Sequence, residues 1–182
     1  LAARVYGAGR NAYQQNELRE RMRTLSSQFL RIKQYSLQDP ETNLPNRAQL
    51  ELHIESLIEH CHTRGGGLGL GIIEVSSPNN ELRLGTLKTI ANSIQLSLRP
   101  MDMVSRFNIN TFAVSVQYQD PEAFNPDLFD RLINSIKRHT LQTTDEGKHL
   151  DISIGVWHGN GFEAPSVSDI ITLAHEACEP IH

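Results

Sequence analysis

Apolar residues recur at alternating spacings of four and three positions between Asn16 and Tyr35, with charged and polar residues elsewhere. This pattern predicts a helix that carries one apolar seam with a seven-residue repeat. Such a helix buries its seam either against its own domain or against a second copy in a short parallel coiled coil. We favour a homodimer through this helix, because little else in the chain is placed to cover the seam. The seam residues are Leu18, Met22, Leu25, Phe29 and Ile32.

The pattern predicts two regions. Residues 1–36 form an N-terminal helix or coiled coil, and residues 37–182 form a separate domain. Within the first region, residues 1–15 lack the seam and are expected to be a frayed connector. In the second region, residues of helical periodicity alternate with short β-rich runs. The predicted class is α/β (α+β). The expected helices are 47–62, 81–98, 127–140 and 167–177, and the expected strands are 68–75, 103–107, 112–116 and 150–157.

The strands at 103–107 and 112–116 are separated by a tight asparagine-containing turn, which is typical of a β-hairpin. The turn residues are Asn108, Ile109, Asn110 and Thr111, followed by Phe112. None of them is a carboxylate, a general base or a glycine. We therefore expect the turn to lack catalytic chemistry.

Composition excludes several classes of function. The net charge of -4 gives no electrostatic footprint for nucleic acid, and two cysteines suggest a reducing compartment rather than a disulfide framework. The His60-Cys61-His62 run lacks further ligands for a metal site, so neither metal nor cofactor is expected.

The chain starts at Leu1 without a methionine. We expect an excised piece of a longer protein, a cytoplasmic domain with or without a membrane anchor upstream.

Four segments, in order and at the right spacing, resemble one bacterial family. Asp39–Arg47 is similar to D-x-L-T-G-L-P-N-R, and residues 87–102 are similar to a helix followed by R-x-x-D. Arg106–Phe112 stands in the place of R-L-G-G-D-E-F, and Ser153–Val156 matches S-I-G-V. The chain from residue 37 onward thus resembles a GGDEF domain, the diguanylate cyclase fold of cyclic-di-GMP signalling. The resemblance implies a central mixed β-sheet flanked by helices, and a leading coiled coil that drives dimerisation.

The resemblance also implies which residues would form an active site, and most of them are replaced. The family holds divalent metal with two acidic residues. Glu74 matches the first, but Asn110 or Thr111 stands at the second. Asn108 and Ile109 replace the glycines that let nucleotide lie on bare backbone. In addition, the guanine-reading segment before the second helix is about seven residues short, and His182 stands in place of a lysine. We expect a degenerate domain that is not an enzyme.

One family site is retained. In the family, R-x-x-D five residues before the signature turn binds cyclic-di-GMP, and Arg99 and Asp102 have that spacing; the resemblance adds Arg131 from the next helix. The alternative is that Arg99 caps its helix and Asp102 begins a turn. The predicted function is an inactive regulatory module that binds cyclic-di-GMP here. Two alternatives remain open: a ligand-free dimerisation scaffold for a neighbour such as an EAL phosphodiesterase domain, and residual GTP binding or turnover.

Overall fold

The computed structural model describes residues 2–78, 82–120, 122, 124–160 and 164–181. The chain divides into two compact units, Leu1–Leu37 and Gln38–His182. Among the described residues, no helix is both long enough and apolar enough to cross a bilayer.

The first unit is a single helix, α1 (Ala2–Leu37). The predicted connector is wrong over residues 2–15, because this alanine-containing stretch has enough helix propensity to continue the helix. Four of the seam side chains are exposed: Leu18 (62%), Met22 (62%), Leu25 (64%) and Ile32 (67%). The side chain of Phe29, the fifth seam residue, lies outside the described part of the chain.

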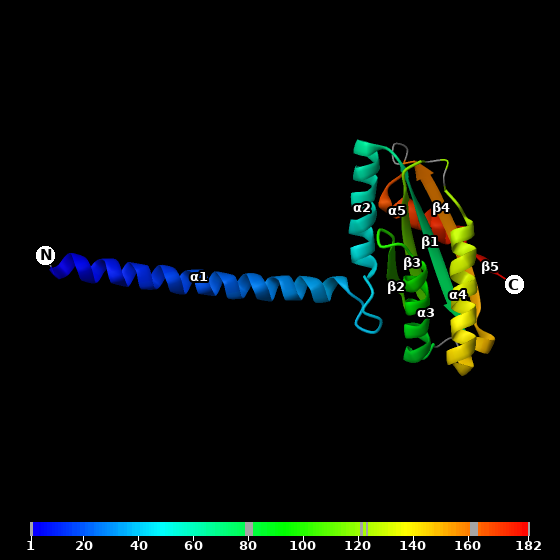
Figure 1. Cartoon of the computed structure of the whole chain (residues 1–182), viewed down its shortest axis with the longest axis horizontal. Helices are drawn as coiled ribbons and strands as arrows, with labels where there is room; N and C mark the ends of the chain where they lie inside the picture. The colour runs from blue at the N-terminus through cyan, green and yellow to red at the C-terminus, as the bar shows by residue number, and fades with distance from the viewer. Residues whose placement is uncertain (1, 79–81, 121, 123, 161–163, 182) are drawn as a thin grey trace. The chain divides into compact units, whose positions relative to one another are not determined.

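The second unit is a helix-flanked sheet (Figure 1). The helices match the predicted ones within a few residues, and a 3-10 helix and a last short strand were not predicted. The helices are α2 (Arg47–Arg64), α3 (Leu84–Ser97), α4 (Asp127–Thr143) and α5 (Val167–Glu176), with the 3-10 helix η2 (Asp145–His149). The strands are β1 (Gly67–Ser76), β2 (Met103–Asn108), β3 (Thr111–Tyr118), β4 (Asp151–Asn160) and β5 (Glu179–Ile181).

The strand order is β2-β3-β1-β4-β5, and every ladder between neighbours is antiparallel. The α/β class with a helix-flanked central sheet is confirmed, but the expected mixture of strand directions is wrong. The crossover through α3 returns β2 parallel to β1. β3 then folds back into the gap between them, so each pair of neighbours runs in opposite directions.

Two hydrophobic clusters cover the two faces of the sheet. One cluster joins α3 and α4 to the sheet, and the other joins α2 and α5 to its opposite face. β1 contributes to both clusters, since Leu70 and Ile72 face α2 and α5 while Ile73 faces α3 and α4. Gly71 contributes no side chain, and a Cβ there would collide with the ring of Phe129 on α4. The glycines of this buried strand thus make room for aromatic rings.

Side-chain caps fix where two helices begin. The Asn46 side chain accepts a hydrogen bond from the Gln49 backbone N–H at 3.1 Å, and Ser166 accepts one from Asp169 at 3.2 Å. These bonds satisfy N–H groups that have no partner inside the helix. The predicted cap at Asn46 is confirmed, and Ser166 rather than Ser168 caps α5.

Candidate functional site

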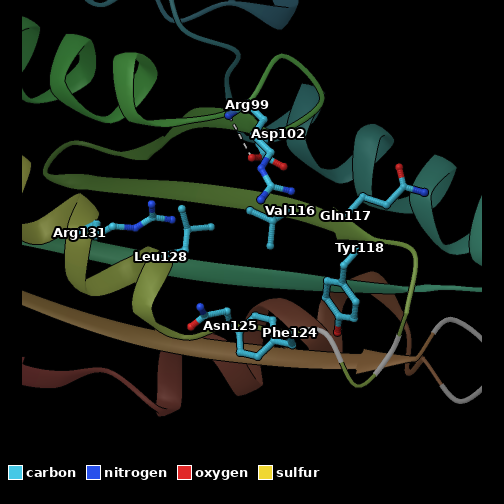
Figure 2. Close-up of a pocket in the computed structure, with 9 residues that line it drawn as sticks. All are labelled: Arg99, Asp102, Val116, Gln117, Tyr118, Phe124, Asn125, Leu128 and Arg131. Atoms are coloured by element: carbon cyan, nitrogen blue, oxygen red, sulfur yellow. Dashed lines mark hydrogen bonds between the residues drawn. The ribbon is translucent and has the colours of Figure 1, made fainter.

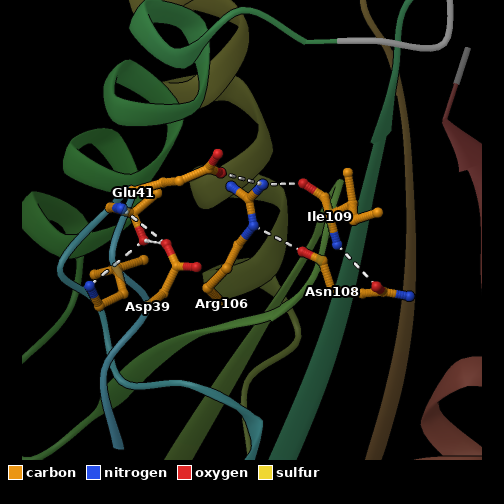
Figure 3. A network of polar contacts seen from close by, with 7 residues as sticks. Asp39, Glu41, Arg106, Asn108 and Ile109 are labelled. Atoms are coloured by element: carbon orange, nitrogen blue, oxygen red, sulfur yellow. Dashed lines mark hydrogen bonds and ion pairs between the residues drawn. The ribbon is translucent and has the colours of Figure 1, made fainter. Parts of the chain in front are cut away.

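The predicted hairpin is present, and a buried arginine supports its turn. Arg106 is 5% exposed, and its Nε donates to the Asn108 carbonyl at 2.7 Å while Nη2 donates to the Ile109 carbonyl (Figure 3). Glu41 lies 3.8 Å from Nη2. Burial lowers the pKa of Arg106, an effect that Asp39 and Glu41 oppose. Arg106 therefore binds two backbone carbonyls of the turn and links the turn to the segment that precedes α2.

The turn presents side chains of mixed exposure. Ile109 is 77% exposed and Asn108 is also exposed, whereas Phe112 is completely buried. The Asn110 carbonyl accepts the Val75 N–H at 2.9 Å, which ties the turn to the end of β1. Asn110 and Thr111 are neutral side chains, so the turn carries no negative charge.

The position assigned to metal by the resemblance contains one carboxylate. Glu74 is the cross-strand partner of Thr111 in the β1–β3 ladder, so the structure brings the two predicted positions together. The Glu74 carboxylate lies 2.9 Å from Nε2 of His175 on α5. Nothing in the spacing of the sequence indicated this pair. Within the described ranges, no group of three or more His, Cys, Asp or Glu side chains is arranged to hold a metal ion. Asn79, Asn80 and His182 lie outside those ranges.

Arg99, Asp102 and Arg131 line a single pocket of about 120 Å³ (Figure 2). Arg99 and Asp102 lie in the loop between α3 and β2, and Arg131 comes from α4. The remaining lining residues are Val116, Gln117, Tyr118, Phe124, Asn125 and Leu128. The juxtaposition expected for the three residues is thus present in the fold.

Asp102 also closes a turn, as the alternative interpretation expected. Its Oδ2 accepts the Arg99 N–H at 3.1 Å, and its own N–H donates to the Arg99 carbonyl at 3.0 Å. Arg99 itself lies beyond α3, which ends at Ser97, so it does not occupy the last helical turn. The turn orients Asp102 beside the pocket while its Oδ1 accepts no hydrogen bond from the residues that the structure describes.

Aromatic side chains form a wall of this pocket that the sequence did not reveal. The rings of Tyr118 and Phe124 lie 5.7 Å apart, and Phe124 stacks on His158 with centroids 4.1 Å apart. The Tyr118 hydroxyl donates to the Leu68 and Gly159 carbonyls at 3.1 and 3.2 Å, which anchors its ring. The pocket therefore offers cationic, anionic and aromatic groups within one small volume.

The domain is thus a helix-flanked antiparallel sheet with this hairpin at one end. The family model described as "Diguanylate cyclase, GGDEF domain" matches residues 85–181, more than half of the chain. The chain belongs to the GGDEF family, and the predicted resemblance is confirmed.

The chain is also similar to individual proteins. It is 28% identical over 156 residues to the diguanylate cyclase DgcP of Pseudomonas aeruginosa, covering 82% of this chain but 23% of that protein. The chain thus spans about a quarter of this relative. Two solved structures share the fold. The coiled coil and GGDEF domain of DgcB from Caulobacter crescentus, in complex with c-di-GMP, has a TM-score of 0.70 at 13% identity, over 90% of each chain. The diguanylate cyclase SiaD of Pseudomonas aeruginosa, in complex with its activator SiaC, has a TM-score of 0.66 at 20% identity, over 97% of this chain and 70% of that one.

Proposed function

We propose that this chain is a catalytically inactive GGDEF domain that regulates cyclic-di-GMP signalling by binding the dinucleotide. The observation that supports the proposal is that Arg99, Asp102 and Arg131 line the same pocket. These residues come from segments that lie up to 32 positions apart (131 − 99), and the fold places them around one volume.

The chemistry of the pocket suits this ligand. Guanidinium groups bind phosphate oxygens through paired hydrogen bonds and also stack on purine bases. A carboxylate accepts hydrogen bonds from the N1 and N2 donors of guanine. Asp102 has an oxygen available for this, and Phe124 contributes an aromatic ring to the lining of the same pocket. The anionic phosphodiester groups and donor-rich guanine edges of cyclic-di-GMP are therefore matched by charge and hydrogen bonding.

The proposed inactivity follows from missing charge. The second of the two positions that would hold metal is Asn110 or Thr111, both neutral, and Thr111 lies opposite Glu74 in the β1–β3 ladder. The remaining carboxylate, Glu74, has His175 at 2.9 Å as a partner. Hard divalent cations require oxygen ligands with sufficient negative charge, and a single carboxylate that is already paired supplies little of it. We therefore expect no metal-assisted attack of one GTP on another.

The test is calorimetric titration of cyclic-di-GMP into the full chain and into Arg99→Ala and Arg131→Ala. We expect binding by the wild type and affinity at least about tenfold weaker in each variant, since a charge-assisted hydrogen bond is lost. Arg64→Ala is the matched control, because it removes an exposed arginine at the end of α2. Wild-type binding that survives Arg99→Ala unchanged would contradict the site. Formation of cyclic-di-GMP from GTP and Mg²⁺ would contradict the proposed inactivity.

A second function is favoured by one further observation. The described seam residues of α1 are 62–67% exposed, and apolar rows of this kind are covered in coiled coils by an identical helix. We propose that α1 forms a homodimer and that the domain transmits signals to neighbouring domains outside this sequence, such as an EAL domain. This second function does not require the binding of cyclic-di-GMP.

Sedimentation equilibrium of the full chain tests the dimer. The wild type should sediment as a dimer, and the double variant Leu18→Asp, Leu25→Asp as a monomer, because a charged seam cannot be buried. Leu96→Asp is the control, since Leu96 is 81% exposed but lies on α3. A monomeric wild type would eliminate this function.

A further inference from the structure

A second hollow lies beside the pocket, on the surface of α4. Its volume is about 490 Å³, and it is lined by Ser97, Arg131, Asn134, Ser135 and Arg138. Arg131 lines both this hollow and the pocket that contains Arg99 and Asp102. The two volumes therefore share one guanidinium group as a common wall.

We infer that this second hollow is a phosphate subsite, in which Arg138 and Arg131 bind a phosphodiester anion. The inference rests on the proposed function, because it extends the same binding surface. It assigns a role to Arg138, Asn134 and Ser135, which neither the spacing of the sequence nor the resemblance singled out.

Helical geometry places these side chains in a row. Positions 131, 134, 135 and 138 fall on one face of α4, since three- and four-residue steps return to the same side of a helix. Arg131 and Arg138 are separated by two turns, or a rise of about 10.5 Å. Their long side chains can approach an anion that lies over the polar Asn134 and Ser135 between them.

One side-chain hydrogen bond between two helices lies at the floor of the hollow. The Ser97 hydroxyl of α3 lies 3.2 Å from the Ser135 hydroxyl of α4, and it donates to the Ser93 carbonyl at 2.8 Å. Ser135 is in turn 3.3 Å from Nδ1 of His139. This network holds the end of α3 against the middle of α4, so the hollow has a defined polar base.

The charge of this surface is uncompensated. Among the described residues, no carboxylate forms an ion pair with Arg99, Arg131 or Arg138, whereas Arg21 and Arg47 each pair with a glutamate one turn away. Asp127 precedes Arg131 by four positions on α4, the spacing of a possible helical pair, yet no ion pair joins them. The C-terminal end of α3 repels an anion, but only with the fractional negative charge of the helix dipole. The two charged side chains that line the hollow are both arginines.

The shared guanidinium group connects the pocket and the hollow. Arg131 lines both volumes, so a ligand bound in the pocket through Arg131 can extend into the hollow. The hollow offers the space and the charge for another phosphodiester. That group belongs either to the same cyclic-di-GMP or to a second molecule.

The experiment is calorimetric titration of cyclic-di-GMP into the full chain, Arg138→Gln and the control Arg64→Gln, at two salt concentrations. We expect Arg138→Gln to weaken binding about tenfold and to reduce its salt dependence, and Arg64→Gln to do neither. An unchanged stoichiometry of one identifies the second phosphate of one molecule. A fall from two to one identifies a second molecule. Equal affinities for Arg138→Gln and Arg64→Gln overturn the inference.

A second probe separates this inference from the proposed function. Inorganic pyrophosphate is titrated into the ¹⁵N-labelled chain while the side-chain Nε–H signals of the arginines are recorded. We expect the Arg131 and Arg138 signals to shift with saturation and the Arg64 signal to stay in place. If the wild type binds no cyclic-di-GMP but these signals shift, the subsite stands and the proposed ligand is wrong. If they do not shift, the subsite is rejected.

Discussion

Glu74 and Thr111 lie directly opposite each other on neighbouring antiparallel strands, and both are positions that the resemblance to the GGDEF family assigns to metal, with Asn110 as the alternative to Thr111. Directly opposed residues have Cβ atoms about 4.5–5.5 Å apart, close enough for two carboxylates to share one cation. Here one member of the pair is a neutral threonine that is 8% exposed, and the other lies 2.9 Å from His175. The geometry of a metal pair is thus retained without the second negative charge.

Restoring the charge should restore metal binding. We expect Thr111→Glu to bind Mn²⁺ at least about tenfold more tightly than the wild type, because a second carboxylate faces Glu74 across the ladder. Combining it with His175→Ala should strengthen binding further by freeing Glu74 from its partner. The measurement is Mn²⁺ titration followed by electron paramagnetic resonance, with circular dichroism to show that each variant is folded.

Thr111→Gln is the control for this prediction, since it adds a side chain of similar size and no charge. Equal Mn²⁺ affinity in the glutamine and glutamate variants would mean that charge at this position is irrelevant. Cyclase activity is not expected to return in Thr111→Glu, because Asn108 and Ile109 still replace the signature glycines.

Much of the fold was predictable because local signals agree with the tertiary structure. The hairpin turn at 108–111 and the cap at Asn46 are determined by short-range chemistry, and both are present. The spacing of Arg99 and Asp102 also placed them correctly in one loop. The directions of the strands were harder to predict, because they depend on the insertion of β3 between β1 and β2 rather than on the pattern within any strand.

The candidate site was only half predictable, because part of it forms through long-range contacts. Phe124 lies in a loop and reaches the pocket by stacking on His158 of β4, 34 positions later (158 − 124). His175 meets Glu74 across about a hundred residues, a contact that α5 packing creates. Arg106 was noted as part of the signature, but its support of two turn carbonyls depends on its burial. No local spacing encodes such contacts.

The glycine of the Ser153–Val156 motif is required for helix packing. A Cβ at Gly155 would collide with the Ala174 carbonyl and lie 2.6 Å from the Cys178 backbone nitrogen. Backbone atoms cannot rotate away, so α5 must shift. We expect Gly155→Ala to lower the free energy of unfolding by about 1–3 kcal/mol, measured by urea denaturation.

Gly85 on α3 provides the matched control, because a Cβ there meets nothing within 4 Å. Gly85→Ala should leave stability unchanged or raise it by up to about 1 kcal/mol through the entropy of the unfolded chain. Similar destabilisation by both substitutions would show that the contact with α5 is not the cause.

Cys178 should be slow to react in the native chain. Burial and the nearby Glu74 carboxylate raise the pKa of its thiol to about 11 from an ordinary value of 9.0. The reactive thiolate is therefore about 100-fold (10 to the power 11 − 9) less abundant at neutral pH than in an unperturbed cysteine. Burial also raises the pKa of Cys61. Titration with a disulfide reagent should label both thiols rapidly only after unfolding, and Glu74→Gln should speed the labelling of Cys178 alone. Rapid native labelling at neutral pH would contradict this assignment.

His53 on α2 should make the fold sensitive to mild acid. Its Nε2 is buried without a hydrogen-bond partner among the described residues, and burial lowers its pKa below 6.5. The unfolded chain therefore takes up a proton near pH 6.5, while the folded chain resists it. Stability is fully present above that pH and falls as pH decreases toward the native pKa, because the unfolded state binds more protons. Urea unfolding between pH 8 and pH 5 should show a smaller loss in His53→Leu than in the wild type. Exposed His62→Leu, at the other end of α2, should retain the wild-type pH dependence, and parallel curves for all three proteins would exclude His53 as the titrating group.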